Sequence, residues 1–527
     1  MSRASRDLLL AAFSGVLLAG AFPPHDAWPL AFAALAPLLV ACRRAPVRRA
    51  AGLGFLTGAV FHLILLYWLV TVMTRFGGLP LPAGVGFLAL LAAYLAAYVA
   101  LFGALVAAAS ARWGTTPALL LAPPIWVGLE VVRGTILTGF PWGTIGYTQH
   151  AELPLLQAAA VGGVHLVSLL VVAVSAGLAL LLDRSATAVA RLAGAGLLAG
   201  VGLAAIAGAW SIPPRVEPAP GEGIEVAAIQ ANVPQDRKWR RAEEEGIVAH
   251  LLAMTATAAD SGATLVVWPE SSSPLSFRRP VEAARPDGSV EHRVEPRAEY
   301  LDQVAALARD RHLAIIAGSV DYRFEEGGWR ATNSAFVVGP DGALGPAYDK
   351  MHLVPFGEYV PLGRVLFFVD RMVQGAIADF IPGRRFEPLP TPAGAAGTFI
   401  CYEAIFPGLV RRLARHADFL VNLTNDAWFG KSGAPAQHLA MAVTRAVENR
   451  RWILRAANTG ISAVVDPAGR VRAREPLDTE AILRARIAAA HGLSLYARCG
   501  DVVGNACAIV AALLTVALRA AFLRPGS

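Results

Sequence analysis

The sequence predicts a polytopic α-helical membrane domain joined to a layered α/β domain that lies outside the membrane. Two observations lead to this prediction. Hydrophobic residues make up 55% of the 527-residue chain and charged residues only 16%, whereas soluble domains usually carry about 25% charged residues. The charge deficit is also uneven. Residues 1–212 are almost entirely apolar or small, residues 222–488 have the charge density of a soluble domain, and residues 502–523 are apolar again.

The N-terminal block is long enough for several membrane helices. Since a helix needs about 20 apolar residues to cross a bilayer, we expect seven crossings in a membrane domain of residues 1–215. An eighth is expected in the C-terminal segment 500–527, followed by a short tail. The first span is not expected to be a signal peptide, because no cleavage pattern follows it and further spans come at once. The expected spans are residues 8–22, 28–41, 53–73, 81–110, 117–132, 161–182, 192–210 and 502–523.

The arginine residues between the spans predict the orientation, because basic loops stay on the cytoplasmic side. With seven spans before the α/β domain, every basic cluster and both termini are cytoplasmic. The α/β domain then faces the periplasm of a bacterial inner membrane. Six spans would place it in the cytoplasm and would scramble the charge pattern, so we expect the first arrangement. The clusters are Arg3 and Arg6, Arg43, Arg44, Arg48 and Arg49, Arg112, Arg184 and Arg191, and Arg519 and Arg524.

The net charge and the cysteines limit the possible partners and chemistry. Much of the net charge of +7 lies in the cytoplasmic loops, and no basic stripe with interleaved aromatic residues indicates nucleic-acid binding. Of the four cysteines, Cys42 and Cys507 fall at or inside spans, and Cys499 lies close to the last span. Only Cys401 lies clearly within the α/β domain. Because no sensible disulfide pair exists, a lone thiol there indicates chemistry and not cross-linking.

Residues 222–488 alternate between strand-like and helix-like segments, which is typical of a layered α/β domain. The region contains neither a GxGxxG sequence at a strand–helix turn nor a phosphate-binding loop. Residues 340–342 form a turn between two strands of an expected hairpin. Strands are expected at 224–232, 264–268, 313–320, 333–338, 397–402, 418–422, 453–458 and 462–466, and helices at 243–259, 297–310, 405–415 and 437–450.

Three residues of this domain suggest one reaction. Cys401 follows a strand-like run and precedes a helix-like one, so we expect backbone N–H groups and the positive helix end to favour its thiolate. Glu270 follows the apolar run 265–269, and Lys350 lies in a segment with little ordinary surface composition. A thiol attacks a carbonyl well when a base removes its proton and a cation stabilises the oxyanion. Alone, either a glutamate or a lysine is usually a solvated surface residue.

Several motifs carry a resemblance to a known family. The sequence Trp268-Pro269-Glu270, the segment around Lys350 and Cys401-Tyr402-Glu403 occur in the order found in the nitrilase, or carbon–nitrogen hydrolase, superfamily, whose triad is Glu, Lys and Cys. The fuller pattern resembles one branch of it, the bacterial apolipoprotein N-acyltransferases, over nearly the whole chain. The further matching segments are residues 139–143, 230–235, 238–239, 355–361, 422–430, 437–438, 445–450 and 455–460.

The resemblance implies a fold and a reaction. The α/β domain is expected to be an α-β-β-α sandwich of the nitrilase type. The enzyme is expected to move an acyl chain from a phospholipid to the N-terminal α-amine of a diacylated apolipoprotein, by a ping-pong mechanism through a thioester on Cys401. Glu270 is then the general base and Lys350 the oxyanion stabiliser. No cofactor is implied, no HxH or HExxH spacing indicates a metal site, and we expect a monomer, although the sequence does not determine the oligomeric state.

Four residues are expected to support the triad. Glu358 corresponds to a second acid that orients the lysine, and its alternative is a solvated glutamate. Glu403 is expected to hold hydrogen bonds within the site, and Tyr402 is expected to shape the pocket. The alternative for both is structural packing at the strand-to-helix turn that carries Cys401, which we call the elbow. Trp239 resembles a lid over the acyl site, although a surface-anchoring tryptophan would look the same.

Two further features have less definite interpretations. The dense apolar segment 360–381, with Phe367 and Phe368, is either a core helix or an amphipathic arm that rests on the outer leaflet. A buried hydrogen-bonding network is the default for a set of motif residues without an assigned role. These are Asn425, Asp426, Trp428 and His438.

Two other function classes remain open at this point. A membrane-anchored amidase or nitrilase would use the same triad with water as acceptor, but it would need one anchor at most. A non-catalytic protein that only binds a lipid or a partner need not keep Glu270, Lys350 and Cys401 together. The number of spans and the complete triad therefore favour the acyltransferase.

Overall fold

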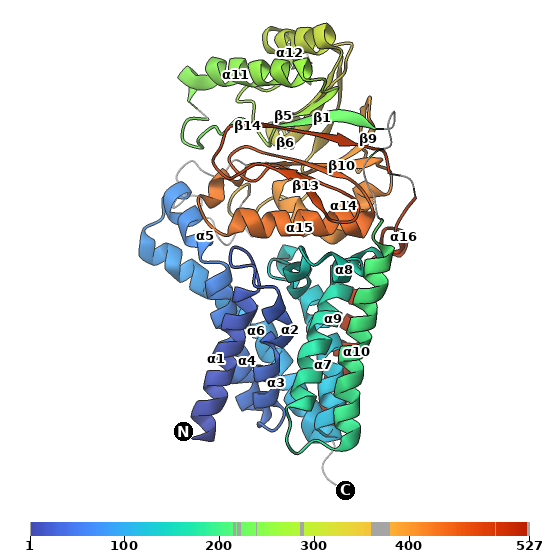
Figure 1. The fold of residues 1–527 in the computed structure, drawn as a ribbon. Helices are drawn as coiled ribbons and strands as arrows, with labels where there is room; N and C mark the ends of the chain where they lie inside the picture. The colour runs from blue at the N-terminus through green and yellow to red at the C-terminus, as the bar shows by residue number, and fades with distance from the viewer. Residues whose placement is uncertain are drawn as a thin grey trace.

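The computed structural model describes residues 2–213, 218, 223–238, 240–284, 289–359, 380–490 and 492–523. Apolar helices form an upright bundle, and the α/β domain stands on one end of it (Figure 1). The N-terminus lies at the opposite end of the bundle. The arrangement agrees with the expected division into a helical membrane part and a layered α/β part.

The bundle contains a helix at each of the eight expected spans. Within the described residues, four helices are long and apolar enough to cross a membrane, or five if the pair Val47–Leu65 and Trp68–Phe76, bent by 51°, counts as one span. The total of eight crossings stays a prediction, since α1 and the shorter apolar helices do not meet this criterion. The helices are α1 (Arg3–Gly20), α2 (Pro29–Ala34), α3 (Ala36–Cys42), α4 (Val47–Leu65), α5 (Trp68–Thr71), η1 (Val72–Phe76), α6 (Leu81–Trp113), α7 (Thr115–Arg133), α9 (Ala159–Leu181), α10 (Ala188–Ser211) and α17 (Val502–Leu523).

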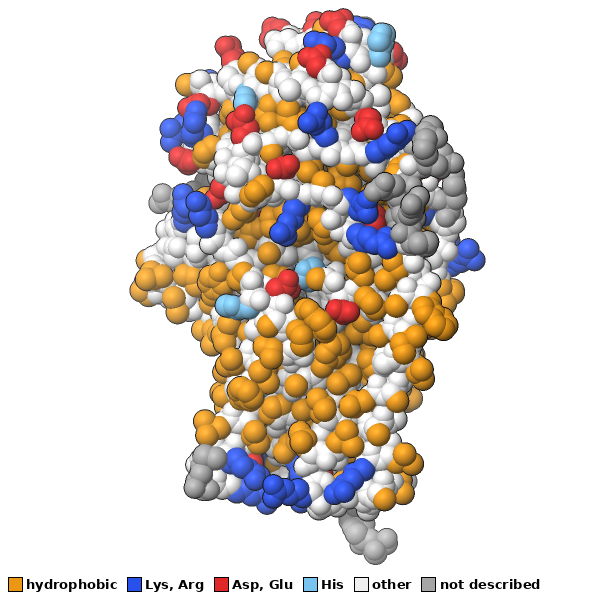
Figure 2. Space-filling model, viewed as in Figure 1, with side chains coloured by type: hydrophobic (Ala, Val, Ile, Leu, Met, Phe, Trp, Pro, Cys, Tyr) orange, Lys and Arg blue, Asp and Glu red, His pale blue; other side chains and the backbone are white. Residues whose placement is uncertain are grey.

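Basic side chains gather at the end of the bundle that lies farthest from the α/β domain. Figure 2 shows an apolar surface over the helices and a group of Lys and Arg side chains at that end. Asp183 accepts a hydrogen bond from Arg43 at 3.1 Å and lies 3.5 Å from Arg44. Asp7 pairs with Arg49 at 2.7 Å. Loops far apart in the sequence thus bring their arginines to one surface.

The α/β domain contains two six-stranded sheets. The first has the strand order β14-β1-β2-β5-β6-β7, the second has the order β13-β12-β11-β10-β9-β8, and β3 and β4 form a separate pair. Strands β1, β2 and β5 are parallel to one another, as are β9, β10 and β11. The strands are β1 (Ile224–Gln230), β2 (Leu265–Val267), β3 (Arg278–Ala284), β4 (Val290–Pro296), β5 (Ala314–Glu325), β6 (Gly328–Val338), β7 (Leu344–Asp349), β8 (Leu389–Thr391), β9 (Gly394–Ile400), β10 (Phe419–Thr424), β11 (Ile453–Ala457), β12 (Ala463–Val465), β13 (Val471–Arg474) and β14 (Ala481–Ile487).

The two sheets stack face to face between helices. Helices α11 (Arg241–Asp260) and α12 (Ala298–Arg311) cover the first sheet, and α14 (Pro407–Ala414) and α15 (Ala434–Asn449) cover the second (Figure 1). Alternation along β1 explains the layering. Ile229 packs in a cluster with α11, whereas Ala228 packs in the cluster that includes the second sheet. The expected α-β-β-α sandwich is confirmed.

Helix α15 lies between the second sheet and the bundle. Every residue of α15 except Ala436 is buried. Glu448 Oε1 accepts a hydrogen bond from the backbone N–H of Val164 in α9 at 2.8 Å, and Arg445 donates to Tyr147 Oη at 3.1 Å. The helix therefore belongs to the core of both parts.

Several details differ from the sequence expectations. Strands β3, β4, β8, β13 and β14 were not predicted, because short or charged edge strands lack a clear apolar alternation. The thiol does not lead directly into an α-helix. A 3₁₀ turn, η4 (Cys401–Ile405), comes first, and α14 begins at Pro407. The expected lid residue Trp239 and most of the apolar segment, residues 360–379, lie outside the described residues.

Candidate active site

The ends of four strands bring the three predicted triad residues and Asn425 into one region. Glu270 follows β2, Lys350 follows β7, Cys401 follows β9 and Asn425 follows β10. The carboxyl ends of neighbouring parallel strands meet at one edge of a sheet, where sites of α/β proteins form. Glu270 is 7% exposed, Lys350 1% and Cys401 7%.

Lys350 lies between two buried carboxylates. Its Nζ donates to Glu270 Oε1 and to Glu358 Oε1, each at 3.0 Å. Burial alone would lower the pKa of Lys350, but the charges of Glu270 and Glu358 hold it well above its usual value. Burial would likewise raise the pKa of Glu270, whereas the charge and hydrogen bond of Lys350 lower it. The structure thus holds a charged ammonium and an ionised carboxylate in contact.

An asparagine that the sequence did not indicate links the same two carboxylates. Asn333 Nδ2 donates to Glu270 Oε1 at 2.8 Å and to Glu358 Oε1 at 2.9 Å. The backbone N–H of Asn425 donates to Glu270 Oε2 at 2.9 Å, and that of Val354 donates to Glu358 Oε2 at 2.8 Å. One feature of the sequence could have pointed to this role, because Asn333 is a polar residue at the start of a buried strand segment.

The thiol of Cys401 is less acidic than the sequence suggested. Burial, followed by the negative charge of Glu270, raises its pKa above the usual range, and Lys350 only partly opposes this. The expectation of a favoured thiolate is therefore wrong. The reason is that the residue is buried and is followed by a 3₁₀ turn of five residues, not by a long helix. The thiol therefore needs a neighbouring base before it can attack.

Glu403 ties the cysteine elbow to the lysine segment. Its carboxylate accepts hydrogen bonds from Tyr348 Oη at 2.9 Å, from the backbone N–H of Met351 at 2.7 Å and from that of Ile400 at 2.6 Å. Burial raises the pKa of Glu403 to about 7 against the effect of these donors. The contacts agree with the expectation that Glu403 holds hydrogen bonds within the site.

Tyr402 packs among aromatic rings. Its ring lies 5.3 Å from that of Phe406 in an edge-on arrangement and 5.8 Å from that of His352. The side chain belongs to the same apolar cluster as residues of the helical bundle. It therefore forms part of the wall between the elbow and the bundle.

A second lysine lies close to the triad. Lys238 is 1% exposed, and its Nζ donates to the backbone carbonyl of Glu270 at 3.2 Å. Burial lowers its pKa to about 8, although the charges of Glu270 and Cys401 act in the opposite direction. Residues 238–239 match the family pattern, but the charged neighbours Asp236 and Arg237 did not indicate that Lys238 is buried.

The four motif residues without a predicted role all have partners. Asn425 Nδ2 donates to Gln235 Oε1 at 2.8 Å, and the ring of Trp428 lies 5.4 Å from that of Phe76 in η1. Asp426 and His438 are fully buried and lie 3.1 Å apart. Asn425, Asp426 and His438 therefore make buried hydrogen bonds, as the default expectation had it, whereas Trp428 makes a ring contact.

Aromatic residues of the bundle contact the turn that follows β10. The ring of Trp68 lies 5.0 Å from that of Trp142 and 4.9 Å from that of Phe429. Tyr147 Oη donates to the backbone carbonyl of Ile405, the last residue of η4, at 3.5 Å. The loops at the upper end of the bundle therefore touch the elbow that carries Cys401.

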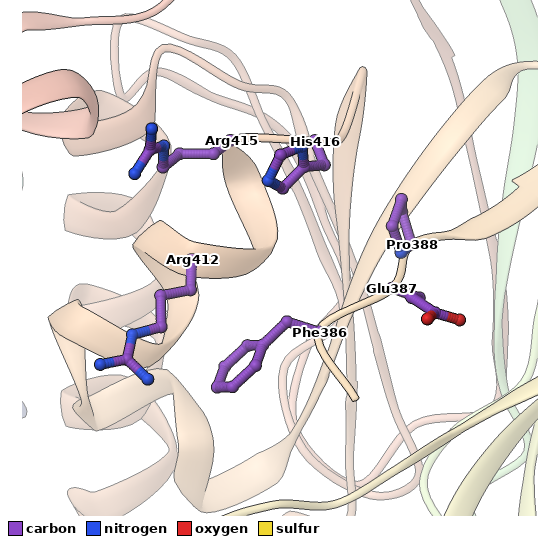
Figure 3. A pocket seen from close by; sticks show the side chains of 6 residues that line it. All are labelled: Phe386, Glu387, Pro388, Arg412, Arg415 and His416. Atoms are coloured by element: carbon purple, nitrogen blue, oxygen red, sulfur yellow. The ribbon is translucent and has the colours of Figure 1, made fainter. Parts of the chain in front are cut away.

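A surface pocket beside α14 has no triad residue in its lining. One pocket of about 480 Å³ lies between α14 and the segment before β8, with Arg412 extending beside Phe386 (Figure 3). Its lining residues are Phe386, Glu387, Pro388, Arg412, Arg415 and His416. In the described part of the chain, no group of three or more His, Cys, Asp or Glu side chains is placed to hold a metal ion.

Comparison with known proteins identifies the family. The carbon-nitrogen hydrolase family matches residues 225–492, and the apolipoprotein N-acyltransferase N-terminal domain matches residues 14–177. An amidase of known structure from Nesterenkonia sp. is 20% identical with a TM-score of 0.37, covering 53% of this chain and 94% of its own. That score is low, so the assignment depends on sequence relatives.

Two of these relatives match over nearly their whole length. The apolipoprotein N-acyltransferase of Geobacter metallireducens is 40% identical, and the match covers 96% of this chain and 95% of the relative. That of Azotobacter vinelandii is 36% identical, with 93% and 91% covered. The chain therefore belongs to the apolipoprotein N-acyltransferase family.

Proposed function

We propose that this acyltransferase takes an acyl chain from a phospholipid and passes it to the N-terminal α-amine of a diacylglyceryl-cysteine in an apolipoprotein. Cys401 carries the chain as a thioester between the two steps. The observation that supports this is the buried contact of Lys350 with Glu270 at 3.0 Å, at the strand ends where the Cys401 elbow begins. Aromatic residues of the membrane bundle lie against the same region.

In the first step the thiol attacks the ester carbonyl of the phospholipid. Glu270 takes the thiol proton as a bond forms between Cys401 Sγ and the carbonyl carbon. Lys350 stabilises the negative charge that develops on the carbonyl oxygen. The carbon–oxygen bond to the glycerol then breaks, and the departing lysophospholipid oxygen takes the proton from Glu270. The acyl chain remains on Cys401.

In the second step an amine replaces the thiol. The α-ammonium of the acceptor loses one proton to the solvent, and the resulting amine attacks the thioester carbonyl carbon as Glu270 takes a second proton from its nitrogen. Lys350 again faces the developing oxyanion, and the carbon–sulfur bond breaks. The amide product carries the chain, and the thiolate recovers a proton through Glu270. Glu358 keeps Lys350 in place through both steps, since its carboxylate accepts from the same Nζ at 3.0 Å.

We propose that the α/β domain is periplasmic and that both termini are cytoplasmic. The support is the gathering of basic side chains at the end of the bundle farthest from the α/β domain (Figure 2). A membrane-impermeant maleimide added to intact spheroplasts should label the exposed Cys499. A cysteine introduced by Ser185→Cys at the basic end should react only after lysis. The reverse pattern would place the α/β domain in the cytoplasm.

Two successive incubations test the reaction. Purified protein receives a phospholipid with an isotope-labelled acyl chain, and mass spectrometry should find that chain on Cys401. A synthetic diacylated lipopeptide, added next, should remove the label and become triacylated. Cys401→Ala should carry no label, while Glu270→Gln should acylate about 10²- to 10⁴-fold more slowly. Release of free fatty acid with an unchanged lipopeptide would instead indicate a hydrolase.

A further inference from the structure

Three fully buried polar side chains lie behind the cysteine elbow. His438 comes from α15, Arg455 from β11, and Asp426 from the turn after β10. His438 is 0% exposed, Asp426 1% and Arg455 0%. The proton transfers described above use none of them, so their burial needs a separate explanation.

His438 is bonded directly to the backbone of the nucleophile. Its Nε2 lies 2.9 Å from the carbonyl oxygen of Cys401. Because a carbonyl oxygen only accepts hydrogen bonds, Nε2 must carry a hydrogen and donate it. The imidazole thus holds the peptide group between Cys401 and Tyr402.

Asp426 and Arg455 hold the imidazole ring in turn. His438 Nδ1 lies 3.1 Å from Asp426 Oδ1 and 3.2 Å from an Arg455 guanidinium nitrogen. The same guanidinium nitrogen donates to Asp426 Oδ2 at 2.7 Å. Burial would raise the pKa of Asp426, but the charges of Arg455 and His438 hold it at about 2, so the carboxylate is ionised.

The backbone of Cys401 requires such support. Its φ is +48°, in the left-handed region that residues with a Cβ seldom adopt. A strained backbone of this kind persists when the surroundings over-determine it. Glu403 fixes one side through the N–H of Ile400 at 2.6 Å, and His438 fixes the other side through the Cys401 carbonyl.

We propose that His438 is a positioning residue for acyl transfer, with Asp426 and Arg455 as its supports. The C=O and N–H of a trans peptide point in opposite directions. By holding the Cys401 carbonyl toward α15, His438 also turns the N–H of Tyr402 away from α15. The strained elbow thereby presents thiol and backbone N–H in one fixed orientation. This inference rests on the proposed role of Cys401 as nucleophile.

A pair of amide variants tests the proposal. His438→Gln places an amide nitrogen near the position of Nε2, within reach of the Cys401 carbonyl, whereas the shorter side chain of His438→Asn reaches only the position of Nδ1. Single-turnover acylation of Cys401 by labelled phospholipid should be about 10- to 100-fold slower in His438→Asn, the effect of an unsatisfied buried group. His438→Gln should recover most of the rate. The KM for phospholipid should stay the same in both.

A control on the same helix separates positioning from stability. Thr444→Val removes a buried hydroxyl whose one hydrogen bond among the described residues goes to the Ala440 carbonyl within α15, at 3.0 Å, and should acylate at the wild-type rate. Equal acylation rates for the Gln and Asn variants, or failure of both to fold, would overturn the positioning role. A wild-type protein that never forms acyl-Cys401 would instead overturn the proposed function.

Discussion

Glu270 and Glu358 accept hydrogen bonds from the same two nitrogen atoms, Lys350 Nζ and Asn333 Nδ2. Each carboxylate uses its Oε1 atom for both bonds. The four groups form a closed ring in which Asn333 opposes the ammonium. The single charge of Lys350 is therefore shared between two acids, and the neutral amide supplies the remaining donor.

Asn333→Leu should weaken both the site and the fold. It removes one amide that bonds two charged groups, and hydrogen bonds to charged groups are worth about 1.5–3 kcal/mol each. We expect acyl transfer to fall at least about tenfold and the thermal midpoint in detergent to drop by several degrees. Thr332→Val is the matched control, because in the described part of the chain its neighbouring buried hydroxyl bonds only to Ser334, at 2.9 Å. Similar activity losses in both variants would contradict the role of Asn333.

Glu270→Gln should change thiol reactivity and catalysis in opposite directions. The negative charge of Glu270 raises the pKa of the Cys401 thiol, so its removal lowers that pKa and exposes more thiolate at pH 8. Alkylation of Cys401 by iodoacetamide should become faster, although acyl transfer becomes slower. Mass spectrometry of the peptide that contains Cys401 measures the first rate.

Replacement of Lys350 should change the reactivity of the Cys401 thiol in the opposite direction. Lys350 lowers the pKa of the thiol, so Lys350→Met should slow both the alkylation of Cys401 and acyl transfer. In wild type, alkylation should still rise with pH above 9, where an ordinary cysteine levels off. The exposed Cys499 is an internal reference in every sample. A faster reaction of Cys401 in Lys350→Met would refute this electrostatic account.

Glu403→Gln should disturb the elbow without removing its volume. The carboxylate accepts from Tyr348, Met351, His352 and Ile400, and an amide would turn its N–H₂ group against at least one donor. Leaving a buried donor unpaired costs about 1–3 kcal/mol. Acylation should therefore slow by about tenfold or more. If Glu403→Gln acylates like wild type, the carboxylate does not set the elbow geometry.

Glu448→Ala should loosen the contact between α15 and the bundle. The change leaves Arg445 buried without its ion pair at 2.9 Å and the N–H of Val164 without its acceptor. Removal of one partner of a buried pair costs about 3–5 kcal/mol. The aggregation midpoint in detergent should fall markedly. Glu448→Gln also loses the charge that pairs with Arg445 but keeps an oxygen acceptor for Val164, so its loss should be smaller yet still clear, and an unchanged midpoint in either variant would argue against this account.

The sequence could suggest Glu270 and Cys401 as candidates because each comes soon after an apolar, strand-like run. In the structure Cys401 directly follows β9, and Glu270 lies three residues after β2. Asn333 and Lys238 could not be assigned, since their contacts depend on which strand lies next to which. The raised pKa of Cys401 was missed for a related reason. The burial of Cys401 depends on how the whole domain packs, and it cannot be read from the residues of a motif.

The apolar helices were equally predictable, but the place of α15 was not. Its sequence is typical of a helix with one apolar face, yet both faces are covered. Gln437 accepts from Trp142 Nε1 at 2.8 Å and donates to the carbonyl of Pro23 at 2.9 Å. Gln437 thus bonds to loops of the bundle more than 250 positions away in the chain, a contact that the helix sequence alone does not indicate.

The enclosure of α15 has a consequence for how two lipid-bearing molecules meet. Because α15 is packed between the second sheet and the bundle, we expect it not to act as a hinge, so that the elbow keeps its position relative to the upper ends of the bundle. In the proposed reaction, the phospholipid and the lipoprotein would both have to reach a Cys401 that keeps its position. We therefore expect the movement that brings an ester carbonyl to the thiol to come from the lipid substrate.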